Sequence, residues 1–179
     1  MGETKTQITD EKLAQVRVNA QVTIGLNFMG AGRFEDALKG FDRALADDPD
    51  EPRALMGRAI ALARLARFDA ALEAATELIS RDPESGRAYD TRGAIYQMMG
   101  KWREAEIAFE KAIALEPHNA AHYYNYACYW ARRLDAERCR HHLAEALRLN
   151  PGSNIFAATD IDFALYRDDP WFQDLVAFK

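Results

Sequence analysis

Six side chains that could bind a metal lie close together in the sequence: His118, His122, Cys128, Cys139, His141 and His142. Imidazole nitrogens and thiolates bind zinc when four of them converge in a tetrahedral arrangement. Adjacent residues diverge around a helix, so His141 and His142 do not face the same ion. Cys139 falls at a small, packed position of the pattern described below, and Cys128 faces the opposite side of its helix pair. We therefore expect packing and surface roles for these residues, with no metal site and no cofactor.

No arrangement of residues typical of catalysis occurs in the sequence. It has no glycine-rich phosphate-binding loop, no metalloprotease HExxH pair and no nucleophile elbow. Acidic residues are frequent, but Glu104, Glu106 and Glu110 occur beside Lys111, a pattern typical of a solvated helix surface. We expect a protein that is not an enzyme.

The composition limits the classes of partner. The chain is 49% hydrophobic and 28% charged with a net charge of −5, so it has no overall attraction to nucleic acid or to anionic membranes. No apolar run approaches the roughly 20 residues that a membrane helix needs, and the first residues lack the apolar stretch of a secretory signal. We expect a cytoplasmic protein that binds another protein, without nucleic-acid binding or membrane insertion. The abundance of Ala and Arg is typical of a GC-rich bacterial genome.

An internal repeat organises the chain. Pro49, Pro83, Pro117 and Pro151 are separated by 34 residues each, and each follows an apolar-periodic run that ends in acidic or polar residues. A proline at that place ends one helix and helps to start the next turn. The spacing predicts four units of equal length, residues 18–51, 52–85, 86–119 and 120–153.

Small residues recur at two positions of every unit. Antiparallel helices approach closely only where the facing side chains are small, and bulky neighbours fill the adjacent grooves. Aromatic or large apolar residues occupy the eleventh and many twenty-fourth positions, among them Phe28, Trp130, Phe41 and Phe109. The small residues stand at the eighth position (Gly25, Ala59, Gly93, Ala127) and at the twentieth (Ala37, Ala71, Ala105, Cys139).

These features resemble the tetratricopeptide-repeat (TPR) family, whose 34-residue period and small/large pattern the chain reproduces over residues 18–153. The resemblance implies an all-α fold, a right-handed superhelical solenoid of antiparallel helix pairs. It also implies that the first helix of each unit lines a concave groove. The candidate partner-binding residues carried over from the family are Asn19, Leu26, Met29, Arg53, Met56, Ile60, Arg64, Arg87, Asp90, Met98, Tyr124, Asn125 and Arg132.

The groove departs from the pattern of the family members that bind chaperone tails. Those members hold a terminal carboxylate with Lys, Arg and Asn side chains. The corresponding residues here are Val22, Leu26, Gly57, Arg87 and Thr91, of which only Arg87 is basic. We therefore do not expect the chaperone-tail function.

Both ends extend beyond the repeats. Residues 1–17 form an N-terminal extension of the first helix, which Thr9 or Asp10 can cap and which runs to about Met29. Its apolar residues Ile8, Leu13 and Val16 either fold back on the array or meet another subunit. Residues 154–179 are expected to cap the last helix pair, with a helix that starts at Asp169-Pro170 and an apolar stripe that includes Trp171 and Phe178. The alternative is a tail that binds a partner.

The sequence thus predicts a protein–protein interaction module, an adaptor or an assembly scaffold. Adaptable methionines and carboxylate-binding arginines favour a partner segment that carries both apolar and acidic residues. An alternative for the arginines is that they only solvate the inner face. An alternative for the whole chain is a self-assembling homo-oligomeric scaffold that uses its N-terminal overhang or its C-terminal cap.

Overall fold

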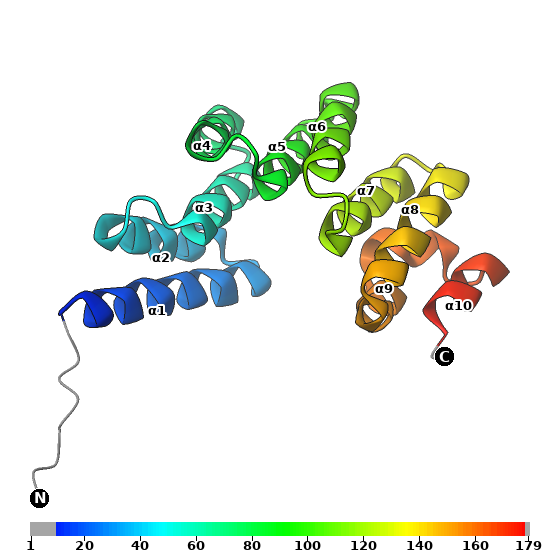
Figure 1. Ribbon diagram of the computed structural model, residues 1–179, viewed down its shortest axis with the longest axis horizontal. Coiled ribbons are helices and arrows are strands. Elements are labelled where there is room, and N and C mark those ends of the chain that lie inside the picture. The colour runs from blue at the N-terminus through cyan, green and yellow to red at the C-terminus, as the bar shows by residue number, and fades with distance from the viewer. Residues whose placement is uncertain (1–9, 178–179) are drawn as a thin grey trace, which may run out of the picture. The chain divides into compact units, whose positions relative to one another are not determined.

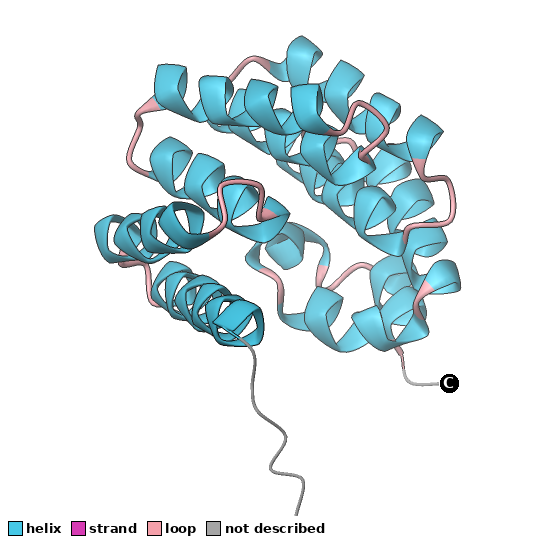
Figure 2. Cartoon of the chain, turned by 60° about the vertical axis from the view of Figure 1, so that its left-hand side comes forward, coloured by secondary structure: helices cyan, strands magenta, loops and turns pink. Residues whose placement is uncertain are grey.

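The computed structural model describes residues 10–177, and within that range the chain consists of helices and loops without a strand (Figure 1, Figure 2). The chain divides into two compact units, Met1–Arg81 and Asp82–Lys179, which we call unit 1 and unit 2. The expected start of the first helix at Thr9 and the apolar side chains Ile8 and Phe178 lie outside the described residues.

Unit 1 contains two consecutive helix pairs (Figure 1). The second pair begins with a well-defined cap, because the Glu51 carboxylate accepts a hydrogen bond from the amide of Arg53 and Pro52 stands in the first turn. Leu13 and Val16, on the N-terminal extension, are exposed and do not pack on the pairs. The helices are α1 Asp10–Gly30, α2 Phe34–Asp47, α3 Pro52–Arg64 and α4 Phe68–Arg81.

Phe41 is the centre of the unit 1 core. Its ring is fully buried and packs with Val18 and Val22 of α1. Glycines make the room for it, since a Cβ on Gly25 would lie 2.6 Å from a ring carbon of Phe41. The paired helices approach closely at Gly25, one of the predicted small positions, and its neighbour there is Gly40, which the pattern did not single out: a Cβ on Gly40 would lie 3.0 Å from the backbone of Gly25.

Unit 2 contains two further helix pairs followed by a C-terminal segment of short helices (Figure 1). Side chains cap three of its α-helix starts, at Ser85, Asn119 and Asp135. The elements are α5 Gly86–Met98, α6 Trp102–Leu115, α7 Ala120–Arg132, α8 Ala136–Leu149, η1 Pro151–Ser153, α9 Asn154–Thr159, η2 Ile161–Tyr166 and α10 Pro170–Val176.

The C-terminal segment belongs to the core of unit 2. Phe163, Tyr166 and Phe172 are buried in one cluster with Phe109 and Leu143 from the helix pairs. The Phe163 ring meets Phe172 at a centroid distance of 5.7 Å. The segment therefore covers the apolar side of the last helix pair, as a terminal cap of a solenoid must.

The turns between paired helices need a left-handed residue. Gly32 and Gly100 fill this position with φ of 71° and 73°, whereas Ala66 and Leu134 adopt φ of 57° and 61° without being glycine. A left-handed conformation costs an ordinary residue about 1–2 kcal/mol. The two non-glycine turns are therefore strained.

Leu134→Gly should raise the free energy of unfolding by about 1 kcal/mol, because glycine removes the left-handed strain but loses more entropy on folding. Urea denaturation measures this change. Leu134 is 69% exposed, so its side chain contributes little packing. Leu134→Ala is the control, since it retains the strain and should stay within about 0.5 kcal/mol of wild type. Equal stability of the two variants would contradict the explanation.

Candidate functional site

In unit 1, two of the predicted groove residues contact each other. The Arg53 guanidinium donates a 2.5 Å hydrogen bond to the side-chain oxygen of Asn19, one repeat earlier. It also forms a 2.7 Å ion pair with the buried carboxylate of Glu51, and this hydrogen bond raises the pKa of Arg53. Arg53 is therefore engaged within the protein, not presented to a partner.

The other predicted groove residues of unit 1 have mixed environments. Leu26 is 50% exposed, while Met29, Met56 and Ile60 are half-buried. Arg64 is exposed, and its guanidinium lies 5.8 Å from the centre of the Phe34 ring.

In unit 2, the predicted residues of α7 contact the C-terminal segment. The Tyr124 hydroxyl donates a 2.8 Å hydrogen bond to Asp160, and burial together with this bond raises the pKa of Tyr124. Arg132 forms a 2.8 Å ion pair with Asp162. The chain's own C-terminal segment therefore occupies part of the face that the family resemblance assigned to a partner.

The remaining predicted residues of unit 2 lie on α5 and α7. Asp90 is buried and accepts a 2.9 Å hydrogen bond from the amide of the exposed Asn125. Met98 is half-buried, and Arg87 is exposed.

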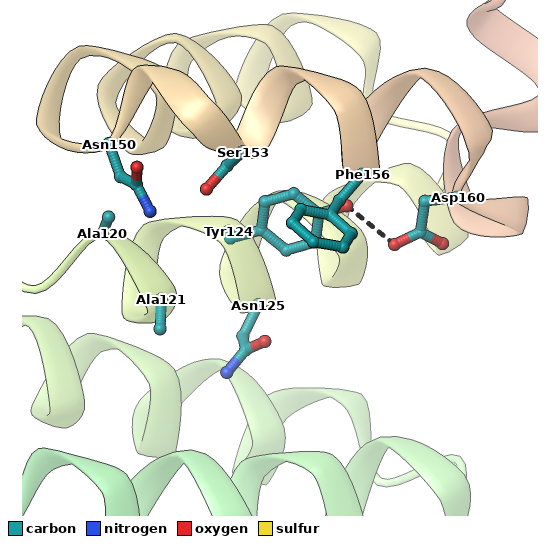
Figure 3. Close-up of a pocket in the computed structure, with 8 residues that line it drawn as sticks. All are labelled: Ala120, Ala121, Tyr124, Asn125, Asn150, Ser153, Phe156 and Asp160. Carbon is teal, nitrogen blue, oxygen red and sulfur yellow. Dashed lines mark hydrogen bonds between the residues drawn. The ribbon is translucent and has the colours of Figure 1, made fainter. Parts of the chain in front are cut away.

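A hollow of about 390 Å³ opens between α7 and the C-terminal segment (Figure 3). Its walls are mostly apolar, with the rings of Tyr124 and Phe156 close together and the polar groups of Asn125 and Asp160 at its rim (Figure 3). Phe156 is 71% exposed, so its ring is available to a ligand. The lining is completed by Ala120, Ala121, Asn150 and Ser153.

A second, more polar hollow adjoins the first one. Arg87, Glu116 and His118 line it, and Ala120 belongs to both hollows. The Arg87 guanidinium makes no hydrogen bond or ion pair within the part of the chain that the structure describes. A free cation thus lies next to an apolar hollow.

A buried polar cluster, whose Glu116 also lines the second hollow, joins α5 to α7. His122 is fully buried, with Nδ1 2.6 Å from Oδ2 of Asp90 and Nε2 3.1 Å from Oε2 of Glu116. An ionised carboxylate only accepts hydrogen bonds. When both carboxylates are ionised, both ring nitrogens donate, and the imidazole carries a positive charge between them.

Neighbouring groups complete the hydrogen bonding of Glu116, whereas the buried Oδ1 of Asp90 has no hydrogen-bond partner among the described residues. The backbone amide of Gly86 donates a 2.6 Å hydrogen bond to Glu116, and the side chain of Asn119 donates one of 2.7 Å. Position 86 needs glycine, because a Cβ there would lie 2.6 Å from Nε2 of His122. The cluster thus connects the start of α5, the loop before α7 and α7 itself.

The pKa values in the cluster reflect burial and pairing. Burial disfavours the charged imidazole, but the hydrogen bonds and charges of Asp90 and Glu116 outweigh it and raise the pKa of His122 above 6.5. Burial raises the pKa of Asp90. Burial opposes ionisation of Glu116 too, yet hydrogen bonds from Asn119, His122 and Gly86 lower its pKa below 4.5.

We expect the stability of unit 2 to fall on the alkaline side. A raised folded-state pKa means that His122 stabilises the fold fully below pH 6.5 and loses this effect as the pH rises through the raised value. Asp90, whose pKa burial raises, acts in the same direction as the pH rises above its ordinary pKa of 3.8. On the acid side, Glu116 loses its effect as the pH falls through its lowered pKa, and His142, whose pKa burial lowers to about 4, adds to that loss.

The loss of stability as the pH rises is therefore the part of the pH profile that tests the charge on His122. Urea denaturation over a pH series should show this loss in wild type and its absence in the double variant Asp90→Leu, His122→Leu, which removes both groups whose pKa is raised. A wild-type profile that stays flat above pH 6.5 would contradict the charged imidazole.

The other histidines and cysteines do not gather around one point. Cys128 and Cys139 are buried as free thiols, and burial raises the pKa of Cys139 to about 12. Within residues 10–177, no group of His, Cys, Asp and Glu side chains has a metal-binding arrangement. Thiols that stay protonated are inert packing groups.

Sequence reasoning missed the Asp90–His122–Glu116 cluster and the contribution of Phe156 and Asp160 to the hollow. The repeat period could have indicated which of these residues contact each other. The pairs Asn19–Arg53, Asp90–Asn125 and Tyr124–Asp160 are 34, 35 and 36 residues apart, and Asp90–His122 is 32 apart. In a solenoid, residues about one repeat apart lie side by side, so complementary side chains at that distance could have been paired.

Helix pairs that recur with a fixed period, without a strand among the described residues, define an all-α helical-repeat protein. Two family models, both described as tetratricopeptide repeat, match residues 22–89 and 86–119, together more than half of the 179 residues. The chain belongs to the tetratricopeptide-repeat family. The predicted family and the predicted all-α fold are therefore confirmed.

Known proteins agree with this fold. Human tetratricopeptide repeat protein 6 is 23% identical over 134 residues, which are 75% of this chain and 26% of that protein, so the chain spans about a quarter of this relative. TTC0263, a thermophilic TPR protein from Thermus thermophilus, is 22% identical with a TM-score of 0.70 and coverages of 89% and 86%. Pseudomonas aeruginosa pilF is 18% identical with a TM-score of 0.63 and coverages of 91% and 69%.

The general function follows from the family. Stacked helical repeats present extended surfaces to other proteins, so the chain has the fold of a protein–protein interaction scaffold. Proteins of this kind are typically not enzymes. Among the described residues, no helix is both long enough and apolar enough to cross a membrane.

Proposed function

We propose that unit 2 binds a segment of a partner protein on the face formed by α5 and α7. An apolar side chain of the segment enters the hollow between α7 and the C-terminal segment, and an acidic side chain pairs with Arg87. The observation that carries this proposal is the unpaired guanidinium of Arg87 beside an apolar hollow.

The hollow suits an apolar side chain anchored by a polar backbone. Tyr124, Phe156 and the methyl groups of Ala120 and Ala121 offer apolar surface. Burying a Leu- or Phe-sized side chain there is worth about 1.5–3 kcal/mol. Asn125 has donor and acceptor groups at the rim, which can bond the peptide backbone of the bound segment.

Arg87 differs from the other three arginines predicted for the groove. Arg53 is held by Glu51, and Arg132 is held by Asp162. Arg64 lies near the Phe34 ring. The hypothesis that groove arginines bind an acidic partner therefore narrows to Arg87, since its fork of donors is open to a carboxylate.

Selection from a random-peptide display library tests the proposal and needs no identified partner. Wild-type protein should enrich peptides that combine an acidic residue with a nearby large apolar residue. Arg87→Glu should lower the affinity of these peptides about tenfold, because it replaces a charge-assisted hydrogen bond by repulsion. Fluorescence titration of the selected peptides measures this loss.

Two further variants make the test specific. Arg103→Glu applies the same charge change on the exposed surface of α6 and should leave the affinity unchanged. Ala121→Phe fills the hollow and should weaken binding without touching Arg87. The proposal fails if no peptide is enriched, or if Arg87→Glu and Arg103→Glu weaken binding equally.

A further inference from the structure

Another hollow of unit 2, of about 560 Å³, is lined by α6, α7 and α8, and we call it the α6–α8 hollow. It shares no lining residue with the two hollows described above. Each helix contributes residues four positions apart, which stand on one side of a helix. The residues that matter for its chemistry are Glu106 and Glu110 of α6, Tyr126 and Trp130 of α7, and Arg138 and His142 of α8. The α6–α8 hollow is therefore a separate feature whose lining combines rings with charged groups.

Arg138 shows how a guanidinium fits into this hollow. Its guanidinium carbon lies 4.2 Å from the centre of the Trp130 ring, and one of its nitrogens lies 3.8 Å from a carboxylate oxygen of Glu106. Another of its nitrogens lies 3.6 Å from the carboxylate of Asp135. Aromatic faces attract cations, and a guanidinium can stack on a ring while it pairs with a carboxylate. One arginine of the chain thus uses the ring and Glu106 together, but two carboxylates share its charge.

Glu110 carries a negative charge without a cationic partner among the described residues. Its carboxylate accepts a long hydrogen bond of 3.4 Å from the Tyr126 hydroxyl and forms no ion pair within residues 10–177. The neighbouring Lys111 lies over the Tyr89 ring instead, 5.9 Å from its centre. Burial raises the pKa of Tyr126, and the charges of Glu110 and Glu106 raise it further. The α6–α8 hollow therefore favours an additional positive charge.

Two buried polar atoms in the lining also lack partners. Nε1 of Trp130 and Nδ1 of His142 make no hydrogen bond within the described part of the chain, although the Trp130 N–H lies near the Tyr126 hydroxyl. Burial, together with the charges of His141 and Arg138, lowers the pKa of His142 to about 4. The imidazole is therefore neutral at neutral pH and can accept at Nδ1, whereas an indole only donates. A ligand that satisfies both atoms brings a donor and an acceptor.

We propose that the α6–α8 hollow binds an arginine side chain of a partner segment. Its guanidinium pairs with Glu110 and Glu106, one helical turn apart on α6, and donates a further hydrogen bond to Nδ1 of His142. A backbone carbonyl of the same segment accepts the Trp130 N–H. A guanidinium suits this lining better than an ammonium, because its planar fork donates in several directions and tolerates contact with rings. The site does not depend on the Arg87 face, so one chain can hold two segments at once.

NMR titration with the peptide acetyl-Gly-Arg-Gly-amide, whose single charge is the guanidinium, tests the proposal. The signals of the Trp130 indole N–H and of the His142 ring should shift and saturate together, with a dissociation constant of roughly 1–10 mM for so small a ligand. Citrulline in place of the peptide's arginine keeps the shape and removes the charge, so this peptide should not bind. Lysine in the same place should bind at least about threefold more weakly, since an ammonium is a point charge.

A matched pair of variants on α6 makes the test specific. Glu110→Gln removes the unpaired charge while it keeps the size of the side chain, and it should weaken the arginine peptide about tenfold. Glu104→Gln makes the same change at an exposed position of α6 that does not line the hollow, and it should leave the affinity unchanged. Arg87→Glu should also leave it unchanged, which separates this site from the Arg87 face. Glu110 is exposed too, so no buried packing is lost.

Four results would overturn the proposal. Saturable shifts at Trp130 and His142 could be absent, or the citrulline peptide could bind as tightly as the arginine peptide. An equally tight lysine peptide would show that the hollow does not recognise the guanidinium. Equal weakening by Glu110→Gln and Glu104→Gln would indicate only a general attraction between a cationic peptide and an acidic protein.

Discussion

Replacing His122 by leucine should lower the free energy of unfolding of unit 2 by about 3–5 kcal/mol. His122 is fully buried between Asp90 and Glu116, and its removal leaves the buried Asp90 carboxylate without its cation. A buried charge that loses its partner keeps the full cost of its desolvation. This is the largest effect that we expect from any single polar residue of the chain.

The same reasoning predicts a rescue. If the cost comes from an unpaired carboxylate, the double variant Asp90→Leu, His122→Leu should recover a substantial part of the lost stability, because an apolar pair leaves no charge behind. His118→Leu is the matched control, since His118 is exposed and should change stability by less than about 0.5 kcal/mol. Urea denaturation of the four proteins measures these differences. Absence of any rescue would show that His122 acts through packing alone.

The second large effect is expected in unit 1. Gly57→Ala should lower the free energy of unfolding by about 2 kcal/mol. The added Cβ would lie 2.3 Å from Cζ of Phe41, which is fully buried and has no space to move into. This overpacking outweighs the gain of about 0.5–1 kcal/mol that alanine brings to a helix interior.

A double-mutant cycle identifies the cause. In a Phe41→Leu background the ring is absent, so Gly57→Ala should cost much less there than in wild type. Gly30→Ala is the control, since a Cβ at Gly30 meets nothing within 4 Å. Equal costs of Gly57→Ala in both backgrounds, measured by thermal and urea denaturation, would rule out the clash with Phe41.

The fold could be predicted from the sequence because the same pattern of small and large residues recurs in four units. Small residues at Gly25, Gly93 and Ala127 are buried where the pattern requires close helices. Gly32 and Gly100 adopt the left-handed conformation that the turns between paired helices require. Ala66 and Leu134 occupy the same turn with the same backbone conformation. The exact boundaries of the four units remain a prediction.

The candidate site was less predictable, for two physical reasons. Family positions name the residues on a face, but not the partners that hold them. Arg53 and Arg132 were predicted to bind a partner's carboxylates, and within the chain Glu51 and Asp162 engage them. The C-terminal segment was predicted as a cap, yet nothing in its sequence indicated that Asp160 would reach Tyr124. Such contacts depend on how the irregular C-terminal segment folds, and this segment does not follow the sequence repeat.

The buried cluster adds a link between the binding face and the stability of unit 2. Asn125 lines the hollow and also donates a hydrogen bond to Asp90, which pairs with His122. A segment that bonds Asn125 therefore acts on the group that holds α5 and α7 together. Binding that orders Asn125 should stabilise unit 2, because a ligand of the folded state stabilises that state.

The most direct test of the proposed function is an amide and side-chain NMR titration of the protein with a display-selected peptide. If unit 2 binds the segment as proposed, the signals of Ala120, Ala121, Asn125 and Phe156 should shift together with the guanidinium of Arg87. They should reach saturation at one common affinity, and Arg87→Glu should weaken all of them. Shifts confined to unit 1, or to α6 and α8, would contradict the proposed binding face.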